Sequence, residues 1–453
     1  MNLPINKSSK DEIKDVWTRI RKRNFSGNTG QAIRNSIFQF STQVAQRLGS
    51  LILTIVLARV LMPELYGLYN LALATIIIFT TLSELGVGQT LIRFVSHALG
   101  KNDKGKAKAY FSYLGKIKFL LILVSMGILL VSAKFIASNY YQKPIFMALV
   151  AGALYVLFSG IVTFFQSTLQ SFNYFRGVFH NELVFEICRV TLVPLAAIVA
   201  LKYSLSNENV LFYIFIALGI SYLIASLFIW LFPYRKINTF PKGKSYLENR
   251  EKKNANKFFL AASTLTLSGI FFGYVDKIIL GRFVSAEYIG YYSAAFNLIA
   301  ALSAIIGFSA VLLPIFSRLD KEQLERGMKK SVKATVLISL AALLGTLVLA
   351  YPVTLIIYGS AYLLSVNMLR AFSIALLILP LIGIYSVYFM SRGKPQILAV
   401  LLGISTIINI GLNYFLITYL LRFGELTATY GAIIAVIVSN LIYFIGMIIW
   451  RKK

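Results

Sequence analysis

The chain has 453 residues, of which 58% are hydrophobic and 14% are charged, and its mean hydropathy is +0.74. These values exclude a set of soluble domains, which would need a more polar surface. A net charge of +28 would suggest nucleic-acid binding in a soluble protein, whereas in a membrane protein it is typical of basic cytoplasmic loops, so we expect no nucleic-acid partner.

Residues 1–33 are predicted to form a cytoplasmic N-terminal segment. They hold seven Lys and Arg residues and no long apolar stretch, so they do not resemble a cleavable signal peptide. Ile13, Val16, Trp17 and Ile20 follow helical spacing among basic residues. This pattern predicts an amphipathic helix over residues 11–23 that lies on the membrane surface.

Twelve stretches are long and apolar enough to cross a membrane. A spanning helix needs about 20 largely apolar residues, because the hydrocarbon core is about 30 Å thick and each residue rises about 1.5 Å. The sequence therefore predicts an all-α polytopic membrane protein. The predicted spans are residues 37–60, 68–92, 119–136, 145–169, 183–201, 210–232, 258–280, 288–314, 332–351, 364–390, 397–420 and 428–450.

The basic residues predict the orientation of these spans. With twelve crossings, 35 of the 45 Lys and Arg residues fall at one membrane surface, including seven from Arg93 to Lys118, and six fall at the other. Basic loops stay on the cytoplasmic side. We therefore expect a multi-pass protein of the cytoplasmic membrane with both termini in the cytoplasm.

An internal repeat divides the chain into two halves. Residues 55–70 align without a gap to residues 278–293, and the alignment pairs Arg59 with Arg282 and Gly67 with Gly290. Both copies follow the first span of their half on the same side, which indicates two parallel six-helix bundles around a central cavity. The predicted organisation is residues 34–232 as the first bundle, 233–257 as a basic cytoplasmic linker and 258–453 as the second bundle.

Three segments give the sequence a family resemblance. The repeated Arg, acidic residue and Gly-x-Tyr motif, the segment VDKIILGRF (Val275 to Phe283) and the segment ELGVGQTLIRFVS (Glu84 to Ser96) resemble bacterial and archaeal polysaccharide (O-antigen-type) flippases. These belong to the multidrug, oligosaccharidyl-lipid and polysaccharide exporter superfamily. The resemblance implies two six-helix bundles, a V-shaped central cavity, alternating access and a polyprenyl-diphosphate-linked oligosaccharide as the substrate.

Polar residues follow one face of the first span. Gln39, Gln43, Arg47, Ser50 and Thr54 are separated by three or four residues, so they share a face that avoids lipid. Arg47 lies midway along the span, and its guanidinium suits a diphosphate because it binds two oxygens at once. Alternatively, Arg47 pairs with a buried carboxylate and holds the bundle together.

Further charged residues are candidates for the substrate site. Glu84 is either a proton-coupling carboxylate or the partner of Arg47 or Arg93. Asp276 and Lys277 end the seventh span, on a helix whose Gly269 and Gly273 predict a close helix contact, and Asp276 is also a candidate cation ligand. Arg93 and Arg318 are placed to receive a headgroup or to anchor the helices at the membrane surface.

No catalytic or metal-binding motif accompanies these spans. There is one cysteine, Cys188, no phosphate-binding Gly-x-x-x-x-Gly-Lys-Ser/Thr loop and no His/Cys cluster. We therefore expect a protein that is not an enzyme and has no cofactor.

The leading hypothesis is a flippase for cell-surface glycan export, with membrane lipids and possible polymerase or glycosyltransferase partners. A cation-coupled multidrug antiporter of the same superfamily is the alternative. A non-transporting scaffold for glycan enzymes is a third class, which the polar stripe disfavours.

Overall fold

The computed structural model of the chain describes residues 27–237, 240, 246–307, 312, 316 and 319–452. The predicted amphipathic helix at residues 11–23 and Arg318 lie outside the described residues. Within them the chain is helical and contains no strand.

The first half contains α2 to α8, which continue one another through short turns. Their bounds are α2 (Gly27–Glu84), α3 (Val87–Gly100), α4 (Lys104–Lys134), η1 (Phe135–Tyr141), α5 (Phe146–Ser171), α6 (Phe175–Lys202), α7 (Asn207–Ile229), η2 (Trp230–Tyr234) and α8 (Arg235–Ile237).

The second half begins with α9 and ends with α16. Its elements are α9 (Asn249–Phe283), α10 (Ala286–Ile306), α12 (Lys321–Ile357), η3 (Ser360–Tyr362), α13 (Ser365–Phe372), η4 (Ser373–Leu377), α14 (Leu379–Ser391), α15 (Pro395–Leu420), η5 (Leu421–Phe423) and α16 (Glu425–Lys452).

The predicted number of membrane crossings is consistent with this structure. Eleven helical stretches of the described chain are long and apolar enough to span a membrane, and the first of them, Ile33–Gly100, has 68 residues. At about 1.5 Å per residue this stretch is roughly 100 Å long, enough for more than one crossing. The chain reverses within it at Met62, whose φ is 59°, so it supplies two of twelve crossings.

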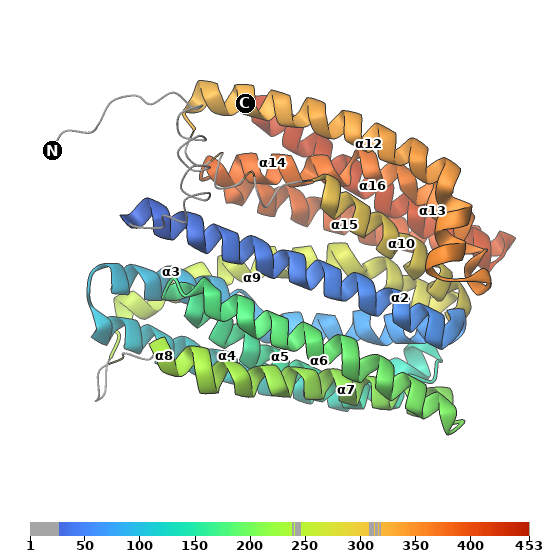
Figure 1. Cartoon of the computed structure of the whole chain (residues 1–453), viewed down its shortest axis with the longest axis horizontal. Helices are drawn as coiled ribbons and strands as arrows, with labels where there is room; N and C mark the ends of the chain where they lie inside the picture. The colour runs from blue at the N-terminus through green and yellow to red at the C-terminus, as the bar shows by residue number, and fades with distance from the viewer. Residues whose placement is uncertain are drawn as a thin grey trace.

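The helices form two lobes (Figure 1). Helices α3 to α7 make one layer and α12 to α16 the other, with α2, α9 and α10 between them. We call the ends that carry most Lys and Arg the basic end, on the left in Figure 1, and the opposite ends the far end. The expected all-α fold of two six-helix bundles is confirmed.

The two halves cross at the pair of glycines that the repeat aligns. A Cβ atom on Gly67 would lie 1.8 Å from the carbonyl oxygen of Ala286, and a Cβ atom on Gly290 would lie 2.0 Å from that of Pro63. Each glycine therefore faces the residue four positions before its counterpart. This reciprocal contact is what a two-fold relation between parallel repeats requires, and it brings α2 and α10 into backbone contact.

The close helix contact predicted at Gly269 and Gly273 of α9 is wrong. A Cβ atom on Gly273 would have no atom within 4 Å, and one on Gly269 would only touch Leu402 at 3.9 Å. The spacing of two small residues indicates where close approach is possible, but the partner helix decides whether it occurs.

We expect Gly67→Ala to destabilise the protein although alanine is the better helix former. The added methyl group has no room against the Ala286 carbonyl, and overpacking costs about 1–3 kcal/mol. The melting temperature of the purified variant in detergent measures this loss of stability. Gly273→Ala, which adds the same group in open space, should leave that temperature unchanged or raise it. Equal melting temperatures for the two variants would contradict the crossing.

Candidate functional site

A cavity of about 350 Å³ lies between the two halves of the fold. It is bounded by α2 on one side and α10 on the other. Its polar lining residues are Gln46, Arg47, Ser50 and Thr54 from α2 and Asn297 from α10; the remaining lining is aliphatic. The predicted polar face of the first span thus faces the interface between the lobes over part of its length.

Arg47 carries the only formal charge in this lining. Its Nη1 donates a hydrogen bond of 2.8 Å to the carbonyl oxygen of Ala304 on α10, and the residue is exposed. Among the described residues it forms no ion pair, so no carboxylate of that part of the chain compensates its charge, and most of its donors remain for a ligand. The alternative in which Arg47 pairs with Glu84 is wrong.

The predicted residues Gln39 and Gln43 lie nearer the basic end of α2. Gln39 is exposed and Gln43 is half-buried, and neither lines the cavity. Gln46 lines it instead. The prediction followed steps of four and three residues from Gln39, and it therefore passed over Gln46, which adjoins Arg47 on the exposed side of the helix.

Glu84 belongs to the interior of the first lobe. Its Oε2 lies 2.5 Å from Lys118 Nζ and accepts a hydrogen bond from Thr163 Oγ1 at 3.2 Å. Its Oε1 accepts the backbone N–H of Gly88 at 2.9 Å, which caps the first turn of α3. Glu84 therefore pairs with neither Arg47 nor Arg93, and it joins α2, α3, α4 and α5.

The sequence assignment of Lys118 to a basic loop is wrong. The side chain of Lys118 is only 3% exposed and its ammonium lies on Glu84. Charge counting misplaced it because a lysine immediately before an apolar stretch is equally compatible with a loop and with a buried pair. Four of its neighbours in that count, Lys101, Lys104, Lys106 and Lys108, do precede or begin α4.

We expect Lys118→Met to lower the stability of the protein strongly. It leaves the Glu84 carboxylate partly buried without its cation, and breaking a buried pair costs about 3–5 kcal/mol. The double variant Glu84→Gln/Lys118→Met removes both charges and should recover most of the loss. Thermal unfolding in detergent of the parent, Lys118→Met, Glu84→Gln and the double variant measures this coupling, and additive effects would show that the two side chains act independently.

Arg93 connects the first lobe to the second half of the chain. Its guanidinium lies 4.4 Å from the centre of the Phe258 ring on α9. On the same side of the molecule, Lys106 Nζ lies 2.5 Å from Glu251 Oε1 of α9. The basic half of α9 is therefore bound to α3 and α4, and Arg93 lies apart from the central cavity.

Asp276 and Lys277 are buried beside one another on α9, with 3% and 6% of their surface exposed. The Tyr292 hydroxyl donates to Asp276 Oδ2, whereas Oδ1 has no partner in the described part of the chain. The ammonium of Lys277 lies 5.4 Å from the centre of the Phe296 ring. These two residues are brought together with α10, and neither lines the central cavity.

Sequence reasoning missed an ion pair behind the cavity wall. Arg189 Nη2 on α6 lies 2.7 Å from Glu186 Oε2 and donates to Ser50 Oγ at 2.9 Å. A Cβ atom on Gly49 would lie 1.9 Å from Glu186 Oε2, so α2 reaches this pair closely. The signal was available, because Glu186 and Arg189 are three residues apart inside one predicted span, residues 183–201.

The paired arginines of the repeat close the far end of the molecule. Arg59 donates to the carbonyl oxygens of Ile356 and Ile357, at the end of α12. Arg282 donates to those of Asn139 and Tyr140, in η1. Each arginine thus binds the free carbonyl end of the third spanning helix of the opposite half, where a cation is favourable.

Two tyrosines reinforce this closure. The Tyr362 hydroxyl donates to the Ala58 carbonyl oxygen at 2.9 Å, and the Tyr141 ring lies where a Cβ atom on Gly281 would come within 2.8 Å. The repeat aligns Ala58 with Gly281, so these contacts also have two-fold symmetry. Nearer the cavity, Asn297 Nδ2 donates to the Tyr66 hydroxyl at 3.0 Å and connects the two lobes.

The two lobes, the interlobe cavity and the closed far end define a transporter-type membrane protein. A family model described as polysaccharide biosynthesis protein matches residues 32–320, so the chain belongs to that family. A second model, for the C-terminal part of the protein export membrane protein SecD/SecF, matches residues 278–402, less than half of the chain.

The chain is similar to one curated relative and to two solved structures. The probable low-salt glycan biosynthesis flippase Agl15 of Haloferax volcanii is 24% identical over 215 residues, which are 46% of this chain. The chain spans only 44% of that relative's length in this match.

The structure of the lipid II flippase MurJ in an inward closed conformation has a TM-score of 0.70, at 15% identity over 92% of this chain and 87% of that one. An inward-facing multidrug resistance transporter of the MATE family and MOP superfamily has a TM-score of 0.68, at 15% identity over 92% and 98%. The expected family is confirmed by the family model, and the chain has the fold of these two solved structures.

Proposed function

We propose that this protein is a flippase that moves a polyprenyl-diphosphate-linked oligosaccharide across the cytoplasmic membrane by alternating access. The observation that carries the proposal is Arg47, whose guanidinium forms no ion pair with the described residues and lies in the wall of the interlobe cavity, at the middle of a predicted span. A charge in this position is costly in a membrane unless water or a ligand meets it. A diphosphate supplies the matching charge and geometry.

The rim of the cavity suits a substrate with a lipid tail. Leu48 and Ile305 line the cavity and are 55% and 64% exposed, and Ile52 beside them on α2 is 47% exposed. The polar head can therefore lie against Arg47 while a polyprenyl chain stays against apolar side chains at the edge between α2 and α10. Gln39, Gln43, Arg93 and Arg318 stay predicted contacts of the head on its path from the basic end.

The closed far end supports the alternating-access part of the proposal. Two arginine contacts, two tyrosine contacts and the glycine crossing all join the lobes on that side of the cavity. Release to the outer leaflet would require the Arg59 and Arg282 contacts to break. An inside-negative potential favours outward movement of an anion by about 2.3 kcal/mol per charge and 100 mV.

The orientation and the partners belong to the same proposal. The basic end faces the cytoplasm because most of the Lys and Arg residues lie there. The substrate then reaches the protein from enzymes that assemble lipid-linked sugars on the cytoplasmic leaflet. Glycosyltransferases and a polymerase are the partners that this chemistry implies.

Transport by the purified full chain in liposomes tests the function directly. A fluorescent polyprenyl-diphosphate oligosaccharide is placed in the inner leaflet, and a membrane-impermeant quencher outside reports its arrival. We expect quenching to exceed that in protein-free liposomes, and an inside-negative potential to accelerate it. Expulsion of a cationic dye without movement of the glycolipid would favour the multidrug antiporter and contradict the proposal.

A further inference from the structure

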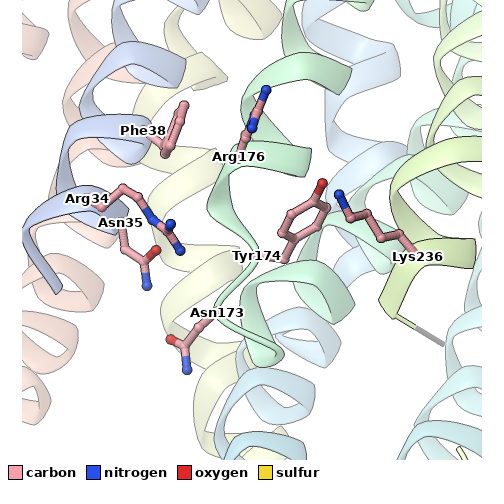
Figure 2. A pocket seen from close by; sticks show the side chains of 7 residues that line it. All are labelled: Arg34, Asn35, Phe38, Asn173, Tyr174, Arg176 and Lys236. Carbon is pink, nitrogen blue, oxygen red and sulfur yellow. The ribbon is translucent and has the colours of Figure 1, made fainter. Parts of the chain in front are cut away.

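A second cavity, of about 270 Å³, lies at the basic end of the first half (Figure 2). Its lining contains three cations, Arg34, Arg176 and Lys236, with two asparagines and the aromatic rings of Phe38 and Tyr174, and it contains no carboxylate. Among the described residues none of the three cations forms an ion pair. The cavity therefore has a concentrated positive charge that the protein does not neutralise there.

Three separate elements build this cavity. Arg34 comes from the start of α2, Arg176 from the first turn of α6 and Lys236 from α8. Tyr174, in the turn before α6, stands between them, and the side chains of Arg34 and Lys236 approach it from opposite sides in Figure 2. The ammonium of Lys236 lies 5.9 Å from the centre of the Tyr174 ring.

The Tyr174 ring in the lining packs closely against α6. A Cβ atom on Gly177 would lie 2.6 Å from the Tyr174 ring and 3.0 Å from Pro233. A glycine at position 177 leaves room for this ring against α6. The charged groups therefore surround a formed recess between helices.

The depth of the cavity corresponds to the lipid headgroups. Arg34 precedes Arg47 by 13 positions on α2, which is about 20 Å along a helix, whereas half of the hydrocarbon core is about 15 Å. With Arg47 at mid-membrane, Arg34 lies at the level of the phosphates, where tyrosines such as Tyr174 are also favoured. Phe38 is one turn closer to the membrane centre, and its ring packs 5.9 Å from that of Phe179.

We propose that this cavity binds the headgroup of an anionic phospholipid from the leaflet at the basic end. The three cations bind the phosphate, and an acyl chain lies along Phe38 and Phe179. Basic pockets between spanning helices on the cytoplasmic side are known to bind the head groups of cardiolipin and phosphoinositides. The bound lipid ties the inner ends of α2 and α6 together, and α2 is the helix that carries Arg47.

The proposal names a phospholipid and not the transported glycolipid because of where the lining residues lie. All of them come from the first half of the chain, whereas the central cavity lies between the halves and is lined by α2 and α10. A substrate bound here would stay outside the interlobe path. The proposal thus goes beyond the transport function and stands if the substrate proves to be different.

Native mass spectrometry of the purified full chain in detergent tests the site. Phosphatidylglycerol, cardiolipin and phosphatidylcholine with the same acyl chains are titrated separately. We expect tight adducts with the two anionic lipids only, and a loss of affinity of about five-fold for each cation removed by Arg34→Gln, Arg176→Gln and Lys236→Gln. The triple variant should lose the tight adduct with each anionic lipid and bind all three lipids equally weakly.

A matched control removes the same charge elsewhere at the basic end. Lys253→Gln, Lys329→Gln and Lys330→Gln change exposed residues outside the cavity and should leave the adduct in place. If the triple variant fails to fold, the same titration of Lys236→Gln alone decides. Equal losses in both triple variants, or no loss in either, would overturn the proposal. Displacement of the phospholipid by polyprenyl diphosphate would also overturn it and assign the cavity to the substrate.

Discussion

Replacing Arg47 by alanine should reduce glycolipid transport by at least ten-fold while the protein still accumulates in the membrane. A charge-assisted hydrogen bond contributes about 1.5–3 kcal/mol, which corresponds to roughly 10- to 100-fold in binding. The variant also removes the hydrogen bond to the Ala304 carbonyl, but that contact is at an exposed site and its loss alone should be tolerated. The liposome assay and the amount of folded protein are measured together.

Two further substitutions separate charge from geometry at this position. Arg47→Lys keeps the charge but not the planar pair of donors, so we expect a transport rate between the rates of the wild type and the alanine variant. Gln46→Ala, next to it in the same cavity lining, should have a much smaller effect. Normal transport by Arg47→Ala would reject the assignment of Arg47 as the anion contact.

The double variant Arg59→Ala/Arg282→Ala should open the far end of the protein. Each arginine holds two carbonyl oxygens of the opposite half, so removing both frees the third helix of each half at once. Spin labels at Tyr203→Cys and Leu364→Cys, in a Cys188→Ser background, report the distance between the two halves at that end. We expect a longer-distance population that is small or absent in the parent protein.

Single variants and one control complete this experiment. Because the two arginines occupy equivalent positions, Arg59→Ala and Arg282→Ala should each produce a part of the shift. Arg422→Ala removes an arginine at the same end whose guanidinium lies 5.7 Å from the centre of the Tyr419 ring, and the distances in this variant should match those in the parent. An unchanged distance distribution in the double variant would show that other contacts keep the far end closed.

The sequence was sufficient for the fold because its two strongest signals are independent of partners. Apolar length and the one-sided distribution of Lys and Arg follow from the membrane itself, and the gapless match of residues 55–70 to 278–293 predicts the symmetry. The role of Arg59 and Arg282 could not be predicted in the same way. Their acceptors are backbone carbonyls of the opposite half, which carry no side-chain signature.

The candidate site was predicted in part. Arg47 was identified because a charge in the middle of an apolar span is costly and therefore conspicuous. The partner of Glu84 was not, since Lys118 stands at the edge of an apolar stretch and was counted with a loop. Glu186 and Arg189 were visible at helical spacing, but only the fold places them against Ser50 and the cavity wall.

The position of the Gly67–Gly290 crossing determines how far the ends of the lobes can travel. Gly290 lies about 6 Å from the start of α10 and about 24 Å from its end at Ile306. A rotation of one half about this point would therefore displace the basic end roughly four times as far as the far end. Such a lever opens the basic end widely, as the proposed transport of a bulky sugar requires, whereas a modest separation is enough to break the short arginine contacts at the far end.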